Sequence, residues 1–183
     1  MQLVARTDFC PEAGAGVKVA GNSYCTRASG VDRIRTGSTG TQSDKAGTQQ
    51  RSFSSDNGRT WTGPEPWRAE DRKLFFSPSG CSQLLPHSSG RLFWLGNVCS
   101  ESPKGSQPRY ALVLGEVDTG DRVLRRDTML VVDDRRPPEH VRLALPNFMA
   151  HEDRETGEIL LHISRAFQHG DRTSAAYLSS IQV

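Results

Sequence analysis

Clustered charges, histidines and cysteines are the side chains of this sequence that could bind an ion. Two carboxylates and two guanidiniums follow one another at residues 133–136, where they could bind a cation or form an ion-pair turn. The prolines at 137–138 favour an exposed turn, in which such pairs add little stability. The remaining candidates lack metal-ligand spacing, since no C-x-x-C or H-x-x-x-H pattern occurs. The sequence therefore predicts neither a metal site nor a cofactor.

One motif is specific. Residues 54–61 match the pattern S-x-D-x-G-x-T-W at each of its defined positions, which are Ser54, Asp56, Gly58, Thr60 and Trp61. An aspartate in this place can accept hydrogen bonds from backbone N–H groups of a tight turn, and the glycine can adopt a positive φ. The tryptophan offers a large apolar face to a neighbouring strand. The motif predicts a structural role at a hairpin rather than a catalytic one.

This motif resembles the Asp-box of the sialidase (neuraminidase) superfamily and its BNR-repeat relatives, which are six-bladed β-propellers. Shorter segments resemble the same family and lie at residues 4–7, 77–97, 109–112, 133–136, 147–148 and 152–159. The resemblance covers residues 1–8 and about 51–183. It implies that the Asp-box lies on the outer rim of a blade, away from the catalytic centre.

The resemblance also implies a chemistry, that of an exo-α-sialidase, a glycoside hydrolase acting on sialic-acid-type glycans. It implies that Arg6 and Arg109 bind the carboxylate of the sugar through charge-assisted pairs. Tyr177 would be the nucleophile, with Glu152 as its polarising partner. Each residue also has a structural alternative: a surface arginine, a packed tyrosine or a solvated turn carboxylate. The general acid–base aspartate of the family has no clear counterpart, Asp8 being the nearest in position.

The elements that must position these residues are predicted to be strands. Short apolar or alternating runs are separated by turns containing Gly and Asp, a pattern typical of an all-β fold. The runs occupy residues 84–85, 91–98, 110–117, 123–132, 159–164 and 175–183. Residues 1–8 are predicted to form the first strand of a blade. Residues 9–50 contain few bulky apolar side chains and are predicted to be a disordered insertion.

Length and composition narrow the classes of protein. The chain has 183 residues and a net charge of +2, with no basic cluster that would predict nucleic-acid binding. It has no apolar run of the ~20 residues that cross a membrane, and no signal peptide is visible at its start, so its localisation stays open. A four-stranded blade takes roughly 40–50 residues. Residues 51–183 are therefore predicted to be a partial propeller, and the whole chain about three blades.

Three functions are compatible with these observations. The chain could be an exo-sialidase, a non-catalytic propeller fragment that binds a carbohydrate or a protein, or a truncated chain without an independent function. Exposed strand edges of an incomplete propeller would favour self-association. Disulfide formation also stays open for the four cysteines, Cys10, Cys25, Cys81 and Cys99.

Overall fold

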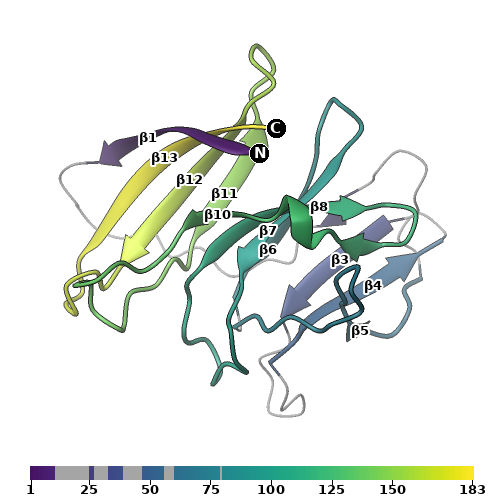
Figure 1. Ribbon diagram of the computed structural model, residues 1–183, viewed down its shortest axis with the longest axis horizontal. Coiled ribbons are helices and arrows are strands. Elements are labelled where there is room, and N and C mark those ends of the chain that lie inside the picture. Colours follow the sequence, from purple (N-terminus) through teal and green to yellow (C-terminus); the bar gives the residue numbers. More distant parts are fainter. Residues whose placement is uncertain (11–24, 27–32, 39–46, 56–59, 79) are drawn as a thin grey trace.

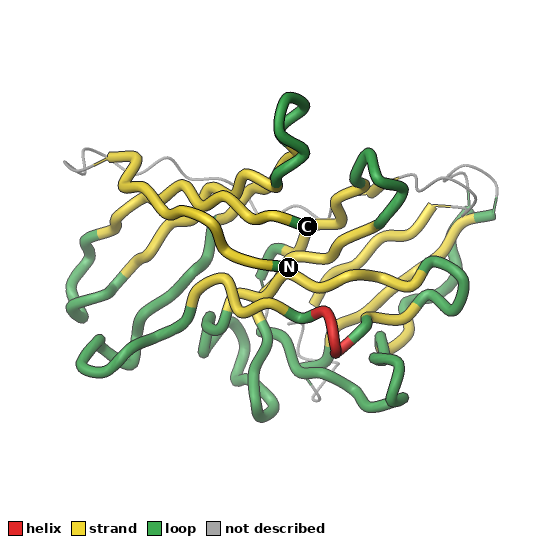
Figure 2. Tube along the Cα trace, turned by 45° about the horizontal axis from the view of Figure 1, so that its top comes forward, coloured by secondary structure: helices red, strands yellow, loops and turns green. Residues whose placement is uncertain are grey.

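A computed structural model shows that the chain folds into three antiparallel sheets (Figure 1). It describes the backbone of residues 1–10, 25–26, 33–38, 47–55, 60–78 and 80–183, and the side chains of 1–2, 47–55, 60–78 and 80–183. The only helical element among these residues is a 3-10 turn, η1 (Arg126–Thr128), drawn in red in Figure 2. No helix in the described part of the chain is long and apolar enough to span a membrane. The all-β prediction is confirmed.

Sheet A contains both ends of the described chain. Its strand order is β11-β12-β13-β1, with all neighbours antiparallel. Because β1 pairs along β13, the N- and C-termini lie side by side (Figure 1). The strands are β1 (Gln2–Cys10), β11 (Phe148–Glu152), β12 (Ile159–Ala166) and β13 (Ser174–Gln182).

Sheet B lies between the other two sheets (Figure 1). Its order is β6-β7-β8-β10, and a short strand β9 pairs with the far end of β8. The predicted strand over 123–132 is therefore an edge strand interrupted by η1. The strands are β6 (Ser82–Pro86), β7 (Leu92–Asn97), β8 (Leu112–Asp118), β9 (Val123–Leu124) and β10 (Leu130–Asp133).

Sheet C has the order β2-β3-β4-β5. Its strands are β2 (Cys25–Thr26), β3 (Arg33–Ser38), β4 (Gln49–Ser54) and β5 (Glu65–Pro66). Strand β6 of sheet B contacts β2 and β3 on one side and β11 of sheet A on the other. Sheet C is thus a meander of consecutive strands, whereas sheet B carries the extra strand β9 and sheet A is completed by β1 from the other end of the chain.

Some strands of sheet C fall within residues 9–50, the range that the sequence predicts to be a disordered insertion. Strands β2 and β3 and the start of β4 fall inside that range, and β1 extends to Cys10. Strand β3 pairs with β4 over its whole length, from Arg33 opposite Ser54 to Ser38 opposite Gln49. Ladder hydrogen bonds with a neighbouring strand can order a segment that lacks the apolar residues to fold alone. The other residues of the range lie outside the described residues.

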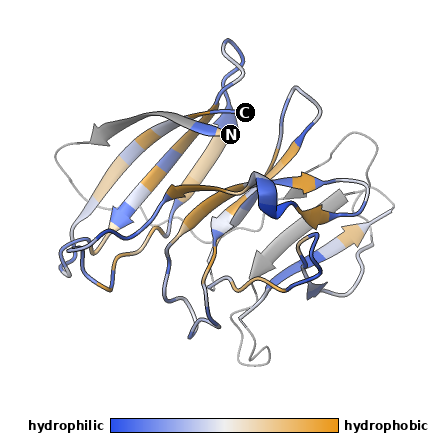
Figure 3. Cartoon of the chain, viewed as in Figure 1, coloured by the Kyte–Doolittle hydropathy of each residue, from blue (hydrophilic) through white to orange (hydrophobic). Residues whose placement is uncertain are grey.

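Among the side chains that the structure describes, two apolar clusters form the core, one on each face of sheet B. The cluster toward sheet A includes Phe93 and Leu95 of β7 with Ile159 and Leu161 of β12. The cluster on the opposite face includes Trp94 of β7. Strand β7 is therefore buried on both faces, whereas β12 alternates between buried and half-buried residues. Figure 3 shows this difference as apolar colour along the strands of sheet B and alternating colour in sheet A.

Candidate functional site

The described residues of the Asp-box lie at the end of β4 and in the connection to β5, the last two strands of sheet C. Ser54 is buried at the end of β4, Thr60 is exposed and Trp61 is half-buried. Phe53 and Thr62 close the hairpin, since the Thr62 N–H donates to the Phe53 carbonyl at 2.8 Å. The Phe53 N–H donates to the Thr62 hydroxyl at 3.0 Å. Asp56 and Gly58 lie outside the described residues, and their predicted roles stay predictions.

Arg6 and Tyr177 lie on neighbouring strands of sheet A. Arg6 on β1 is opposite Ser179 on β13, two residues from Tyr177. Tyr177 is opposite Asp8 on one side and Ile163 of β12 on the other. The ladder thus brings three of the residues named from the resemblance, Arg6, Asp8 and Tyr177, into adjacent register positions.

Glu152 lies at the other end of the same sheet and is not next to Tyr177. It is opposite Ile159, four residues along β12 from the partner of Tyr177, a separation of roughly 13 Å at the usual rise per residue. Its carboxylate accepts hydrogen bonds from the N–H of Ser88, at 2.9 Å, and from the Ser88 hydroxyl. His87 Nε2 lies 3.3 Å from it. The described structure therefore does not form a Tyr177–Glu152 pair.

The contacts of Glu152 also shift its titration. The hydrogen bond from the Ser88 hydroxyl, with those of the Ser88 N–H and the charge of His87, lowers the pKa of Glu152 from its ordinary value. A lowered pKa means that the surroundings stabilise the ionised carboxylate of Glu152. Through its hydrogen bonds with Ser88, Glu152 joins the β6–β7 turn of sheet B to β11 of sheet A.

Arg109 lies in the segment that leads into β8 of sheet B, whereas Arg6 lies in sheet A. Its Nε donates to the Ser106 carbonyl at 3.0 Å. Its own carbonyl accepts the Leu145 N–H at 2.9 Å and the Asn97 side-chain amide at 3.3 Å. Arg109 therefore anchors the start of β8 through its backbone.

A buried ionic cluster, which the sequence did not predict, joins sheets A and B. It consists of Arg165, 1% exposed at the end of β12, with Asp133 of β10 and Glu139. One terminal nitrogen of Arg165 donates to Asp133, and the other donates to Glu139 at 2.5 Å. Burial alone would lower the pKa of Arg165, but the hydrogen bonds and charges of the two carboxylates outweigh it and raise the pKa. Arg165 therefore stays charged, and both of its terminal nitrogens donate to carboxylates.

The cluster corrects the expectation of an exposed ion-pair turn at residues 133–136. Asp133 is buried and pairs with Arg165 of another sheet, with Arg136 at 3.5 Å as a weaker partner. Glu139 accepts a hydrogen bond from the Arg136 N–H at 2.6 Å. Burial raises the pKa of Glu139, but this bond and Arg165 outweigh it, so the pKa lies below its ordinary value. Proximity in sequence predicted the local Asp133–Arg136 pair, whereas the closer partner of Asp133 is Arg165 of another sheet.

A cavity of about 450 Å³ is lined mainly by the segment between β7 and β8, and none of the three residues of the ionic cluster lines it. Tyr110 lines it, and the guanidinium of Arg135 lies over the Tyr110 ring at 5.4 Å from the centroid. Arg135 also donates to the Glu139 carbonyl at 3.1 Å, and its buried Nε has no partner among the described residues. The cavity, here called the Tyr110 cavity, is lined by residues 99–104, Gln107, Pro108, Tyr110 and Val141. An aromatic ring with a guanidinium over it suits a ligand that has both an apolar face and a negative charge.

The cysteines and the acidic residues form no metal site among the described residues. Cys81 and Cys99 are free thiols, and burial raises the pKa of Cys99 to about 11. Within the described residues, no three His, Cys, Asp or Glu side chains are grouped so that they could hold a metal ion.

Comparison with known proteins finds no family model, curated protein or solved structure that matches this chain.

Proposed function

We propose that this chain is a segment of a sialidase-like β-propeller that recognises sialic-acid-type glycans. The observation that carries the proposal is the succession of three antiparallel sheets along the chain. Sheet C has four strands (β2 to β5), sheet B has five (β6 to β10, with β9 off the main order), and sheet A has four, with β1 beside β13. Four-stranded meanders repeated around an axis are the blades of a propeller. In support, the Asp-box falls at the connection between β4 and β5, at the edge of sheet C that β5 forms, and the resemblance expects the motif at the outer rim of a blade.

The Tyr110 cavity is the place where such a glycan would bind. Tyr110 would offer a ring to the apolar face of a sugar, and Arg135, which lies over the Tyr110 ring but does not line the cavity, would offer N–H donors to its carboxylate. Arg165 does not bind the ligand in this proposal, because both of its terminal nitrogens are held by carboxylates. It is a positioning residue that fixes Asp133 and Glu139, and through the Glu139 carbonyl it fixes Arg135.

Binding without hydrolysis is the better-supported form of this function. A tyrosine nucleophile needs its polarising carboxylate within hydrogen-bond distance, and the register keeps Tyr177 and Glu152 four residues apart along β12. The competing function is that of an active exo-sialidase, in which a carboxylate other than Glu152 would polarise the Tyr177 hydroxyl. Asp8, opposite Tyr177 on β1, is the residue whose position favours that form.

Two measurements on the full chain test these forms. Ligand-observed NMR compares sialyllactose with lactose, and we expect only the acidic sugar to bind. Arg135→Gln should weaken its binding about tenfold, the effect of losing one charge-assisted hydrogen bond, whereas Arg172→Gln should leave binding unchanged. A lack of binding by the unmodified chain would contradict the proposal. Turnover of a fluorogenic sialoside, lost in Tyr177→Phe, would establish the enzyme instead, and Arg109→Ala then tests the predicted carboxylate contact.

A further inference from the structure

Sheet A has one face in the core and one face outside it. Five residues of β11 and β12 belong to the core cluster toward sheet B: Phe148, Ala150, Ile159, Leu161 and Ile163. Because side chains alternate between the two faces of a strand, the residues between these five lie on the opposite face. That face is called the outer face of sheet A below. Its residues on β11 and β12 are exposed or half-buried.

Two histidines lie side by side on this outer face. His151 of β11 is opposite Leu160 of β12. His162, two residues further along β12, is opposite Met149, so the two histidines are diagonal neighbours in the ladder. Their ring centroids are 5.6 Å apart, and their ring planes differ by 18°. Two imidazoles that bind one metal ion through nitrogens about 2.0–2.1 Å from it have centroids roughly 5–6 Å apart, so the observed separation suits an ion held between the two rings.

The imidazole of His151 can turn toward such an ion. His151 is exposed, and its ring forms no hydrogen bond or salt bridge among the described residues. The χ2 torsion of histidine is broad, so a small rotation directs a ring nitrogen toward His162. His162 is half-buried and has Met149 opposite it on β11 and Leu178 opposite it on β13. One ring is therefore adaptable, whereas the other lies between two packed neighbours.

Met149 supplies a third donor atom. It lies on the same outer face, directly opposite His162 and two residues from His151. Residues that are directly opposite have Cβ atoms about 4.5–5.5 Å apart, and the unbranched side chain of methionine can bring its sulfur beside the neighbouring ring. The Met149 side chain is 58% exposed, so its thioether is accessible to an ion from solvent. Two nitrogens and one sulfur thus come from three adjacent positions of one ladder.

The charges around the pair favour a cation. Asp153 directly follows β11, and the Glu155 N–H, the Thr156 hydroxyl and the charge of His151 lower its pKa, in that order of importance. The ionised carboxylate of Asp153 is therefore close enough to His151 to interact with a positive charge there. The outer residues of β11 and β12 include no lysine or arginine that would repel such a charge.

We propose that His151, His162 and Met149 form a Cu⁺ site. The thioether is a soft ligand that selects Cu⁺, and imidazole nitrogens bind copper as well. Cu⁺ accepts three ligands, whereas a structural Zn²⁺ site takes four, and no third His, Cys, Asp or Glu joins the pair among the described residues. The ligands come from two strands, so no spacing within the sequence predicts them. The inference does not rest on the proposed glycan binding, since none of these residues lines the Tyr110 cavity.

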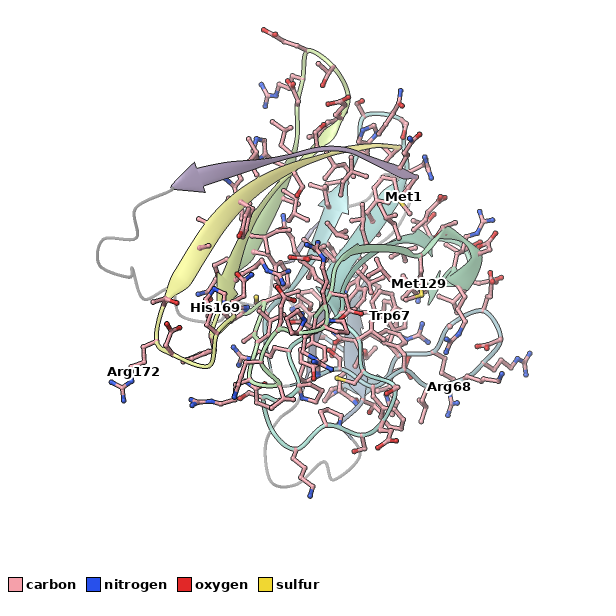
Figure 4. The ribbon with its side chains drawn as sticks, turned by 60° about the vertical axis from the view of Figure 1, so that its left-hand side comes forward. Met1, Trp67, Arg68, Met129, His169 and Arg172 are labelled. Atoms are coloured by element: carbon pink, nitrogen blue, oxygen red, sulfur yellow. The ribbon has the colours of Figure 1, made fainter. Side chains whose placement is uncertain are left out.

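The test follows the three methionines of the full chain by NMR with ¹³C-labelled methyl groups. Bicinchoninate under argon buffers the free Cu⁺ concentration, so the thiols of the chain cannot deplete it. We expect the Met149 methyl resonance to shift as Cu⁺ is added, because its sulfur becomes a ligand. Met1, before β1, and Met129, after η1, are internal controls whose resonances should stay unchanged (Figure 4). An unshifted Met149 resonance, or equal shifts of all three, would overturn the inference.

Variants separate this site from other histidines of the chain. His151→Gln and His162→Gln should each abolish the Met149 shift at the same free Cu⁺ concentration, because each removes one of three ligands. His169→Gln removes an exposed histidine from the turn between β12 and β13 (Figure 4) and should change nothing. A Met149 shift that persists in His151→Gln and His162→Gln would contradict the proposed site.

The thioether is tested separately. Met149→Leu keeps the size and apolar character of the side chain and removes its sulfur, so the variant should fold. Followed through the imidazole resonances of His151, Cu⁺ binding should become about tenfold weaker. Zn²⁺ added to the parent chain should leave the Met149 methyl resonance in place. Equal affinity for Cu⁺ in the parent chain and in Met149→Leu would show that Met149 is not a ligand.

Discussion

The side-chain amide of Gln83 forms two hydrogen bonds with the backbone of Ala150. Its Nε2 donates to the Ala150 carbonyl at 2.6 Å, and its Oε1 accepts the Ala150 N–H at 2.8 Å. Gln83 belongs to β6 and Ala150 to β11, the adjoining strands of sheets B and A. One side chain thus supplies the paired bonds that a neighbouring strand would supply.

Gln83→Leu should destabilise the fold by about 2–4 kcal/mol, because it leaves a buried N–H and a buried carbonyl of Ala150 without partners. Urea unfolding measures the change. Gln182→Leu, at an exposed position of β13, is the matched control and should stay within about 0.5 kcal/mol of the parent chain. Equal effects of the two substitutions would show that sheets A and B do not depend on this amide.

Arg165→Met should cost about 3–5 kcal/mol, because it leaves the carboxylate of Asp133 buried without its main partner. Replacing all three charges, as Arg165→Met, Asp133→Leu and Glu139→Leu together, should recover most of this loss, since buried ion pairs are often replaceable by apolar residues. Arg172→Met provides the control for losing an exposed arginine. A triple variant no more stable than Arg165→Met would show that the loss in Arg165→Met does not come from leaving the two carboxylates unpaired.

The ionic cluster also shows which part of the site the sequence could predict. The alternation Ile159, Leu161, Ile163 identifies β12 and its buried face, and Arg165 continues the same alternation. A buried arginine was therefore readable from the pattern. Its partners were not, because Asp133 and Glu139 come from other elements and hydropathy periodicity carries no information on pairing between sheets. For the same reason the pattern predicted most strands of sheets A and B, but neither β11 nor β3, which pair with β12 and β4.

Glu152 predicts a dependence of stability on pH. Its pKa is lowered in the folded chain, above all by the Ser88 hydroxyl, so ionised Glu152 stabilises the fold above its unfolded pKa of about 4.3. This contribution is lost as the pH falls through the lower, folded value. The stability difference between the parent chain and Glu152→Gln should therefore be largest above about pH 5 and shrink toward pH 3.

Urea unfolding at several pH values between 3 and 7 measures this difference. Glu155→Gln is the control, since Glu155 is an exposed carboxylate on the neighbouring turn without an ion pair among the described residues. We expect its stability to follow that of the parent chain across the series. A Glu152→Gln difference that is independent of pH would contradict the assignment of the charge to the Ser88 contact.

Gly96 is the position where the packing of β7 leaves no room for a side chain. A Cβ on Gly96 would lie 2.3 Å from Cζ2 of Trp94, which is fully buried and packed between Trp67 and Phe75. The strand cannot shift to make room, because β7 is paired on both sides. Gly96→Ala should therefore destabilise the chain by about 1–3 kcal/mol and change its tryptophan fluorescence. Gly63→Ala, with nothing within 4 Å of the added carbon, should leave the free energy of unfolding and the fluorescence unchanged, and equal behaviour of the two variants would show that the indole of Trp94 can move away from Gly96 at no cost.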